Sequence, residues 1–139
     1  MTRITRLNPR LVNCVPDTLE PGVLYVAKRF ATASHLCCCG CGHEVVTPLS
    51  PAKWRLTEYE GSVSLHPSIG SWSFPCRSHY WIDRNAVSWA GAFNPRQIAA
   101  VQARDLHDAV RARHARRPAH YLVARWVRKV WKSIFDRWR

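Results

Sequence analysis

The sequence predicts an α+β fold, in which a small antiparallel β domain, either a meander or barrel-like, is followed by two C-terminal helices. Two observations predict it. From Gly22 to Trp89 the chain consists of short segments rich in β-branched and aromatic residues, separated by Gly, Pro, Ser or Asn. From about Asn94 onward, apolar residues recur at helical spacing instead. We therefore assign residues 1–92 to a β domain and residues 93–139 to a helical extension.

The expected strands follow one another without intervening helices, which favours antiparallel pairing over a parallel sheet with crossover helices. In chain order they are VLYVAK, SHLCC, HEVVTPL, WRLTEY, SVSLH, HYWI and AVSW. The first helix is expected to begin with Asn94 as its N-cap and Pro95 in its first turn. Pro118 interrupts the helical pattern, and a second helix is expected from residue 119 to residue 139.

The positive charge of the chain is concentrated in its last third. Residues 1–92 carry nine Lys/Arg against six Asp/Glu, a net charge of +3. Residues 93–139 carry twelve against three, a net charge of +9. This asymmetry indicates two functional parts.

The sequence contains no segment that approaches the ~20 consecutive apolar residues of a membrane-spanning helix. The N-terminal stretch MTRITRLNPRLVNCV also lacks the apolar core of a secretory signal. We therefore expect a cytoplasmic protein, in which thiols stay reduced and clustered cysteines bind metal more often than they form disulfides.

Four cysteines lie within five positions of HLCCCGCGHEVV, residues 35–46, and Cys76 follows about 35 residues later. Two disulfides within so short a stretch would be severely strained. Tetrahedral Zn²⁺ needs four thiolate or imidazole ligands, and glycines at 40 and 42 allow the backbone to turn tightly. In an extended chain the Cys38 side chain points away from its neighbours. The most economical zinc site is therefore formed by Cys37, Cys39, Cys41 and Cys76.

Two alternatives to this zinc site stay open. His79, three residues after Cys76, could replace one cysteine as a ligand. The cysteines could also be free buried thiols, which pack as small hydrophobic side chains. An iron–sulfur cluster is less favoured, because a CxCxC run is not a usual cluster motif. Cys14 has no evident partner.

A second group of chemically interesting residues lies in LHPSIGSWSFPCRSHYWI, residues 65–82. The segment PSIG is expected to form a tight loop that displays the hydroxyl of Ser68 beside free backbone N–H groups, as an acyl-transfer nucleophile requires. His79 and His66 are the candidate bases for Ser68. Ser78 is a poor partner for His79, since adjacent residues of an extended chain point to opposite faces. Equally, serine is a common turn residue, and C-x-x-H is a common half of a metal site.

The combination of CxCGCG, a tryptophan-containing strand and PSIGxWSFPCRSHYWI resembles the BubE family, which is encoded in bacterial ubiquitination-like operons. The resemblance covers roughly Tyr25 to Trp89 and leaves out the basic C-terminus. It implies a metal-supported β domain and a serine-type peptidase that processes or removes a ubiquitin-like modifier, beside the activating and conjugating enzymes of that modifier. Carried over by position, Ser68 and His79 are its catalytic pair and the cysteines its metal site. Cys38, placed between the spaced cysteines, leaves the ligand register open.

Two classes of function follow. One is a serine hydrolase acting on a ubiquitin-like protein, with Ser68 as nucleophile and His79 as base. The other is a non-catalytic zinc module that docks a ubiquitin-like protein, a conjugation enzyme or nucleic acid through its basic helix. Binding of metal by His79 would favour the second. The residues available as a third catalytic member are Glu44, Glu58, Glu60 and Asp83.

The expected last helix combines a broad apolar stripe with a cationic opposite face. The apolar side of this helix is formed by Leu122, Val123, Trp126, Val127, Val130, Trp131, Ile134, Phe135 and Trp138. Its cations are Arg125, Arg128, Lys129, Lys132 and Arg137. Such a helix can cap the domain core, dock on an acidic partner or lie on an anionic membrane. Nucleic acid ranks last, because no recognised nucleic-acid motif accompanies the charge.

Overall fold

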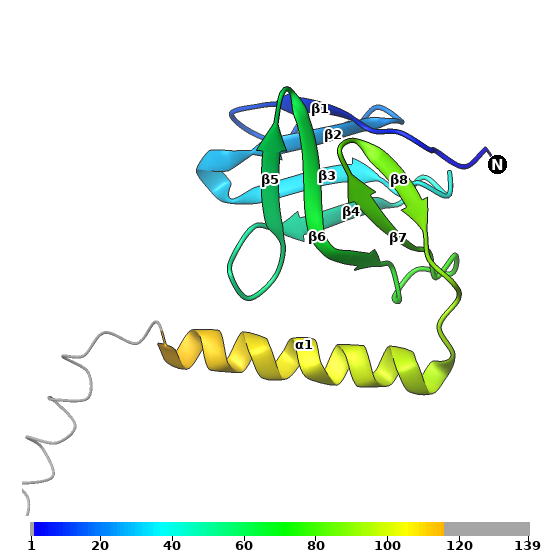
Figure 1. The fold of residues 1–139 in the computed structure, drawn as a ribbon, viewed down its shortest axis with the longest axis vertical. Helices are drawn as coiled ribbons and strands as arrows, with labels where there is room; N and C mark the ends of the chain where they lie inside the picture. Colours follow the sequence, from blue (N-terminus) through cyan, green and yellow to red (C-terminus); the bar gives the residue numbers. More distant parts are fainter. Residues whose placement is uncertain (1, 116–139) are drawn as a thin grey trace, which may run out of the picture. The chain divides into compact units, whose positions relative to one another are not determined.

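The computed structural model describes residues 2–115, which form two four-stranded sheets and one α-helix (Figure 1). The first sheet has the order β1-β2-β3-β4, with β1 at Asn8–Leu11, β2 at Val23–Ala27, β3 at Thr32–Leu36 and β4 at Glu44–Pro48. A short 3-10 turn, η1 at Lys28–Phe30, connects β2 to β3. β1 and β2 run parallel, whereas the other neighbours in this sheet are antiparallel. The expectation of a wholly antiparallel β domain is therefore wrong at its first strand.

The second sheet is an antiparallel meander. It contains β5 at Arg55–Tyr59, β6 at Ser62–Gly70, β7 at His79–Asp83 and β8 at Ala86–Trp89, paired in chain order. The tight β5–β6 and β7–β8 turns contain residues with positive φ, as two-residue hairpin turns require. All seven expected strands are present, within a few residues of their predicted bounds.

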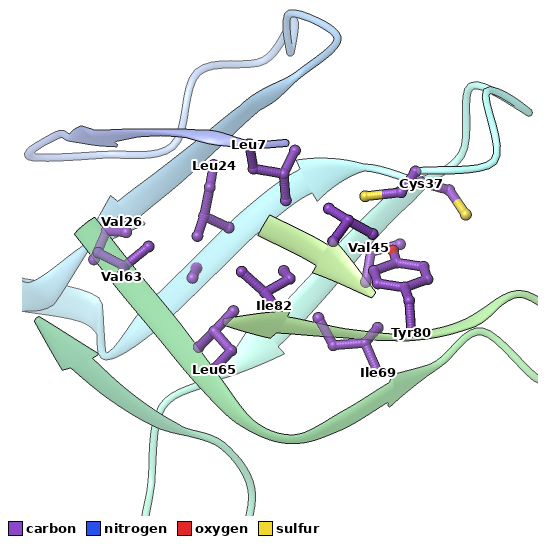
Figure 2. Close-up of a cluster of buried hydrophobic side chains, with 13 residues drawn as sticks. Leu7, Leu24, Val26, Cys37, Val45, Val63, Leu65, Ile69, Tyr80 and Ile82 are labelled. Carbon is purple, nitrogen blue, oxygen red and sulfur yellow. The ribbon is translucent and has the colours of Figure 1, made fainter. Parts of the chain in front are cut away.

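The hydrophobic core lies between the two sheets, because both contribute to one cluster of buried side chains (Figure 2). In β4 burial alternates along the strand, with Val45 and Thr47 inside, so one face is packed and the other is solvated. All five residues of β2 are buried. The core side chains that Figure 2 labels are Leu7, Leu24, Val26, Cys37, Val45, Val63, Leu65, Ile69, Tyr80 and Ile82.

Backbone hydrogen bonds link the two sheets at two places. The segment before β1 pairs with the start of β8: the amide of Leu7 donates to the carbonyl of Asn85 at 2.9 Å, and the amide of Val87 donates to Thr5 at 2.8 Å. At the other junction, Leu49 and Trp54 form a parallel bridge between the end of β4 and the start of β5. The first of these links attaches the N-terminal segment, which has no strong strand pattern, to the second sheet.

The segment Pro67–Gly70 is strand and not the expected tight loop. β6 is nine residues long and continues through it. β5 pairs with β6 only as far as His66, whereas β7 pairs with Ile69 and Gly70 after a register shift between Leu65 and Ile69. The His66–Pro67 peptide is cis. Ile69 is almost fully buried and anchors this part of the strand in the core, which holds the adjacent Ser68 in place.

The α-helix α1 extends over Pro95–Ala115, and its start matches the sequence expectation. The amide of Gln97 donates to the Asn94 side chain and the amide of Asn94 donates to the Gln97 side chain, both at 2.9 Å, which is a reciprocal capping box. Within residues 2–115 this is the one α-helix, where two were expected over the whole chain. The second expected helix and its amphipathic stripe lie outside the described residues.

The first compact unit of the chain extends to Asp105. The functional division between residues 92 and 93 stays a prediction. No helix in the described part of the chain combines the length and the apolar character needed to cross a membrane.

Candidate active site and cysteine cluster

The four cysteines of the predicted metal site converge. The sulfur atoms of Cys37, Cys39, Cys41 and Cys76 all lie within 4.8 Å of one another. Cys37 Sγ is 3.5 Å from Cys39 Sγ, and Cys76 Sγ is 3.9 Å from Cys37 Sγ and 3.8 Å from Cys41 Sγ. A tetrahedral ion with Zn–S bonds of about 2.3 Å requires ligand sulfurs roughly 3.8 Å apart. The donor set and its spacing therefore fit a four-thiolate metal site.

The local backbone explains why closely spaced cysteines can converge. The amide of Cys37 donates to the carbonyl of His43 at 2.8 Å, and the amide of Gly40 donates to Cys37 at 3.0 Å, which closes a compact turn after β3. Gly40 and Gly42 have φ values of +85° and +79°, which residues with a Cβ seldom adopt. Cys38 is fully buried and lies outside the group of four.

The ionisation of the thiols depends on burial and on Ser78. Burial raises the pKa of Cys37, which a hydrogen bond from Ser78 partly offsets. Burial also raises the pKa of Cys41 to about 12. Burial acts in the same direction on Cys39, but hydrogen bonds from Ser78 and Cys41 outweigh it and lower the pKa of Cys39 to about 6. Of Cys37, Cys39 and Cys41, Cys39 thus most readily supplies a thiolate, the form that binds metal.

Cys76 belongs to the loop between β6 and β7, and this loop is closed by its own backbone. The amide of Ser71 donates to the carbonyl of Ser78 at 2.8 Å, and the amide of Arg77 donates to Phe74 at 3.0 Å. The ring of Phe74 also stacks on His43, with the centroids 4.8 Å apart. The loop that carries Cys76 is therefore tied to the cysteine turn, and β7 begins three residues after Cys76.

Ser68 and His79 meet across the β6–β7 pair. His79 is the first residue of β7 and lies opposite Gly70, the last residue of β6. Its Nε2 is 2.9 Å from Ser68 Oγ, a hydrogen-bond distance. His79 is buried, whereas Ser68 is only partly buried. The pair therefore combines a shielded imidazole with a serine that retains some exposure to solvent.

The other candidates for this site lie elsewhere. His66 is exposed on β6, and the hydroxyl of Ser68 bonds to His79 instead. His79 is outside the thiol group, which within the described residues consists of cysteines alone. Ser78 contacts Cys37 and Cys39, so it faces away from its neighbour His79, as an extended chain requires.

None of the four acidic residues considered as a third catalytic member bonds to His79. Glu58 pairs with Lys28 at 2.6 Å, and Asp83 accepts a hydrogen bond from Ser64 at 2.9 Å. The Nδ1 atom of His79 is buried and has no hydrogen-bond partner among residues 2–115. Glu44 and Glu60 are both exposed. In this part of the chain the Ser68–His79 pair therefore has no acidic third member.

Aromatic rings surround the His79 imidazole, a feature that sequence reasoning missed. The ring centroid of His79 is 5.0 Å from that of Trp72, 4.4 Å from that of Phe93 and 5.6 Å from that of Trp81. Trp72 and Phe93 stack on each other at 5.2 Å. The sequence feature that could have indicated this packing is Gly70, two residues before Trp72. An ideal Cβ at this glycine would lie 2.2 Å from the indole, so the ring needs a residue without a side chain there.

The serine–histidine pair and the cysteine cluster both lie in a region that matches a known protein family. The family model described as "Bacterial ubiquitination-like system serine protease (BubE)" matches residues 11–90. The chain belongs to the BubE family. The match spans the cysteine turn, strands β6 and β7 with Ser68 and His79, and the Cys76 loop, and it ends before α1. No curated protein and no solved structure matches the chain.

Membership confirms the resemblance seen in the sequence and identifies the chain as a serine protease of a bacterial ubiquitination-like system. The non-catalytic alternative is not supported by this family. The thiol cluster could hold a metal ion in this BubE-family chain, as its sulfur spacing indicates.

Proposed function

We propose that this protein hydrolyses a ubiquitin-like precursor or conjugate, with Ser68 as nucleophile and His79 as general base. The observation that carries the proposal is the 2.9 Å contact between Ser68 Oγ and His79 Nε2 in a family of serine proteases. A hydroxyl is a weak nucleophile at neutral pH unless a base within hydrogen-bond reach accepts its proton.

In the proposed reaction, Ser68 Oγ attacks the carbonyl carbon of the scissile bond while its proton moves to His79 Nε2. A C–O bond forms and the carbonyl π electrons move to the oxygen. The tetrahedral intermediate then collapses, the C–N bond breaks, and the departing amine takes the proton from His79. Water releases the acyl group from Ser68 by the same steps, with His79 again accepting and returning a proton.

The cysteine cluster would bind one Zn²⁺, through Cys37, Cys39, Cys41 and Cys76. A bound ion would supply a structural cross-link there and no chemistry at the scissile bond. This role is favoured because two residues at the cluster lie close to His79 along the chain. Cys76 belongs to the loop that leads into β7, and Ser78, which contacts two of the thiols, directly precedes His79. Holding this loop would fix the imidazole against Ser68.

The catalytic assignment is tested with two substrates built from the ubiquitin-like protein of the same system. One has a short C-terminal peptide extension, and the other is joined to a lysine side chain. We expect Ser68→Ala and His79→Ala to abolish cleavage, measured by intact mass, and the double variant to be no worse than either, because the two groups act as a unit. The matched controls are Ser73→Ala and His66→Ala, which change an exposed serine and an exposed histidine nearby. Normal cleavage by Ser68→Ala would refute the assignment.

The metal assignment has its own test. Protein purified without added metal should contain one equivalent of zinc by elemental analysis. Cys76→Ser should lose the ion and unfold at markedly lower denaturant concentration, because metal-binding energy contributes to folding energy in small metal-supported domains. Cys14→Ser, which changes an exposed cysteine outside the cluster, is the control and should keep both its zinc and its wild-type stability. A stable wild-type protein without metal would contradict the assignment.

A further inference from the structure

We infer that the indole of Trp72, held in place by Gly70 and Phe93, is a positioning residue that stabilises the protonated ring of His79, one of the two tasks that a third carboxylate would perform there. The inference rests on the proposed function, since it concerns His79 as the base. It starts from an unusual feature of the dyad: the second ring nitrogen of its buried imidazole has no hydrogen-bond partner in the described chain.

A base that takes a proton from Ser68 through Nε2 must carry its own proton on Nδ1 before the reaction. After proton transfer the ring is a cation. In a triad, a carboxylate bonded to Nδ1 fixes this tautomer and stabilises the cation. Around His79, the hydrogen bond and ring contacts of the described residues come from one hydroxyl, that of Ser68, and three aromatic rings.

The three rings come from three different segments. Trp72 follows β6, Trp81 lies on β7 and Phe93 follows β8. None of them titrates near neutral pH, and no ion pair among residues 2–115 involves His79. An aromatic face attracts a cation, most strongly when the cation is shielded from water, and tryptophan does so best. A cage of this kind stabilises the protonated imidazole without a formal negative charge.

The placement of Trp72 depends on Gly70. Three atoms of the indole lie 2.2 to 2.4 Å from the position that a Cβ would occupy on Gly70, so the ring crosses the end of β6 directly over the backbone. Gly70 is also the residue paired with His79. Phe93 stacks on the indole with an interplanar angle of only 12°. Gly70 and Phe93 therefore fix the ring beside the imidazole.

The decisive experiment compares steady-state cleavage of the peptide-extended ubiquitin-like protein by five variants. We expect Trp72→Leu to lower kcat about tenfold with little change in KM, as the loss of one shielded cation–π contact predicts. Trp72→Phe, which keeps an aromatic face, should recover most of kcat.

Gly70→Ala should reproduce the kinetic defect of Trp72→Leu while keeping every aromatic ring, since the new methyl group must displace the indole. Its matched control is Gly91→Ala, where a Cβ would meet nothing within 4 Å. The fifth variant, Ser68→Ala, separates the two proposals. If it still cleaves, the proposed function fails. If it is inactive but Trp72→Leu retains full kcat, only the aromatic assignment fails.

The competing explanation is that a carboxylate from another part of the chain, and not the indole, stabilises the protonated His79. The nine Asp and Glu residues are each replaced by the corresponding amide. The aromatic assignment requires all nine variants to keep kcat within a few-fold of wild type. A loss approaching the roughly 10⁴-fold seen when the acid of a triad becomes an amide would identify a third member and overturn it.

Discussion

Two histidines in this protein make the same hydrogen bond in very different surroundings. His79 lies 2.9 Å from the hydroxyl of Ser68, and His35 lies 2.8 Å from the hydroxyl of Tyr80, each through Nε2. In both rings the Nδ1 atom is buried and has no partner in the described residues. On hydrogen-bond geometry alone the two pairs are equivalent.

The difference lies in what can reach the hydroxyl. His35 and Tyr80 are both fully buried, in the core between the two sheets. Burial lowers the pKa of His35 to about 4 and raises the pKa of Tyr80. Ser68, in contrast, is only partly buried near the end of β6. The comparison teaches that access for a substrate carbonyl, and not the histidine–hydroxyl contact itself, distinguishes a candidate catalytic pair from a structural one.

The largest expected effect separates the two histidines by activity. His79→Gln should reduce cleavage by roughly 10²–10⁴-fold, the usual contribution of a general base. His35→Gln should leave the rate per folded molecule unchanged and lower the denaturant midpoint instead. Both are measured on the same preparations, with the folded fraction taken from circular dichroism. Loss of activity in folded His35→Gln protein would remove the distinction.

A second effect concerns acid stability. The folded protein keeps His35 neutral down to about pH 4, whereas the unfolded chain protonates it near its ordinary value of 6.5. Between these limits the unfolded state binds the additional proton, so stability decreases as pH falls through this window. The loss should reach roughly 3 kcal/mol.

Urea denaturation at pH 7 and pH 4.5 measures this loss. The same two measurements on His35→Gln separate the pH dependence caused by His35 from that caused by the thiols, because the variant loses only the part that His35 contributes. An equal pH dependence in the two proteins would show that His35 is not held neutral.

The smallest effect compares the two hydroxyls. Tyr80→Phe leaves a buried ring nitrogen without its partner and should cost about 1–3 kcal/mol of stability with cleavage unchanged. Ser68→Ala changes a partly buried residue and should alter stability by no more than about 0.5 kcal/mol while abolishing cleavage. Denaturant midpoints of the two variants, measured side by side, provide the check. A larger stability loss in Ser68→Ala would mean that its hydroxyl is mainly structural.

Most strands of the second sheet could be predicted from the sequence, but few of the contacts around Ser68 and His79 could. Alternation in segments such as Val63 to Leu65 revealed the strands because each buries one face. β1, in NPRL, was missed since three of its four residues are exposed and its order comes from parallel pairing with β2. The continuation of β6 was missed because Pro67 and Gly70 normally indicate a turn, and only pairing with β7 makes them strand.

The candidate site divides in the same way. The cysteine set could be proposed because spacing along a short turn limits the choices, and Ser68 and His79 could be proposed because they flank one hairpin connection. The aromatic cage depends on Phe93, which follows β8, and on the close approach of Trp72 to Gly70. The His35–Tyr80 pair joins residues 45 positions apart. Contacts of this kind arise from packing and leave no periodic trace in the sequence.

The position of Ser68 within a core strand has a consequence for how the protein loses activity on heating. Its neighbour Ile69 is 2% exposed and is paired in register with Tyr80, which is fully buried. Many active sites lie on loops that open well below the temperature at which the domain melts. Here Ser68, the proposed nucleophile, can leave its place only when the sheet that contains Ile69 comes apart. Thermal inactivation should therefore coincide with global unfolding, and the amide of Ile69 should be among the slowest in the protein to exchange its hydrogen with solvent.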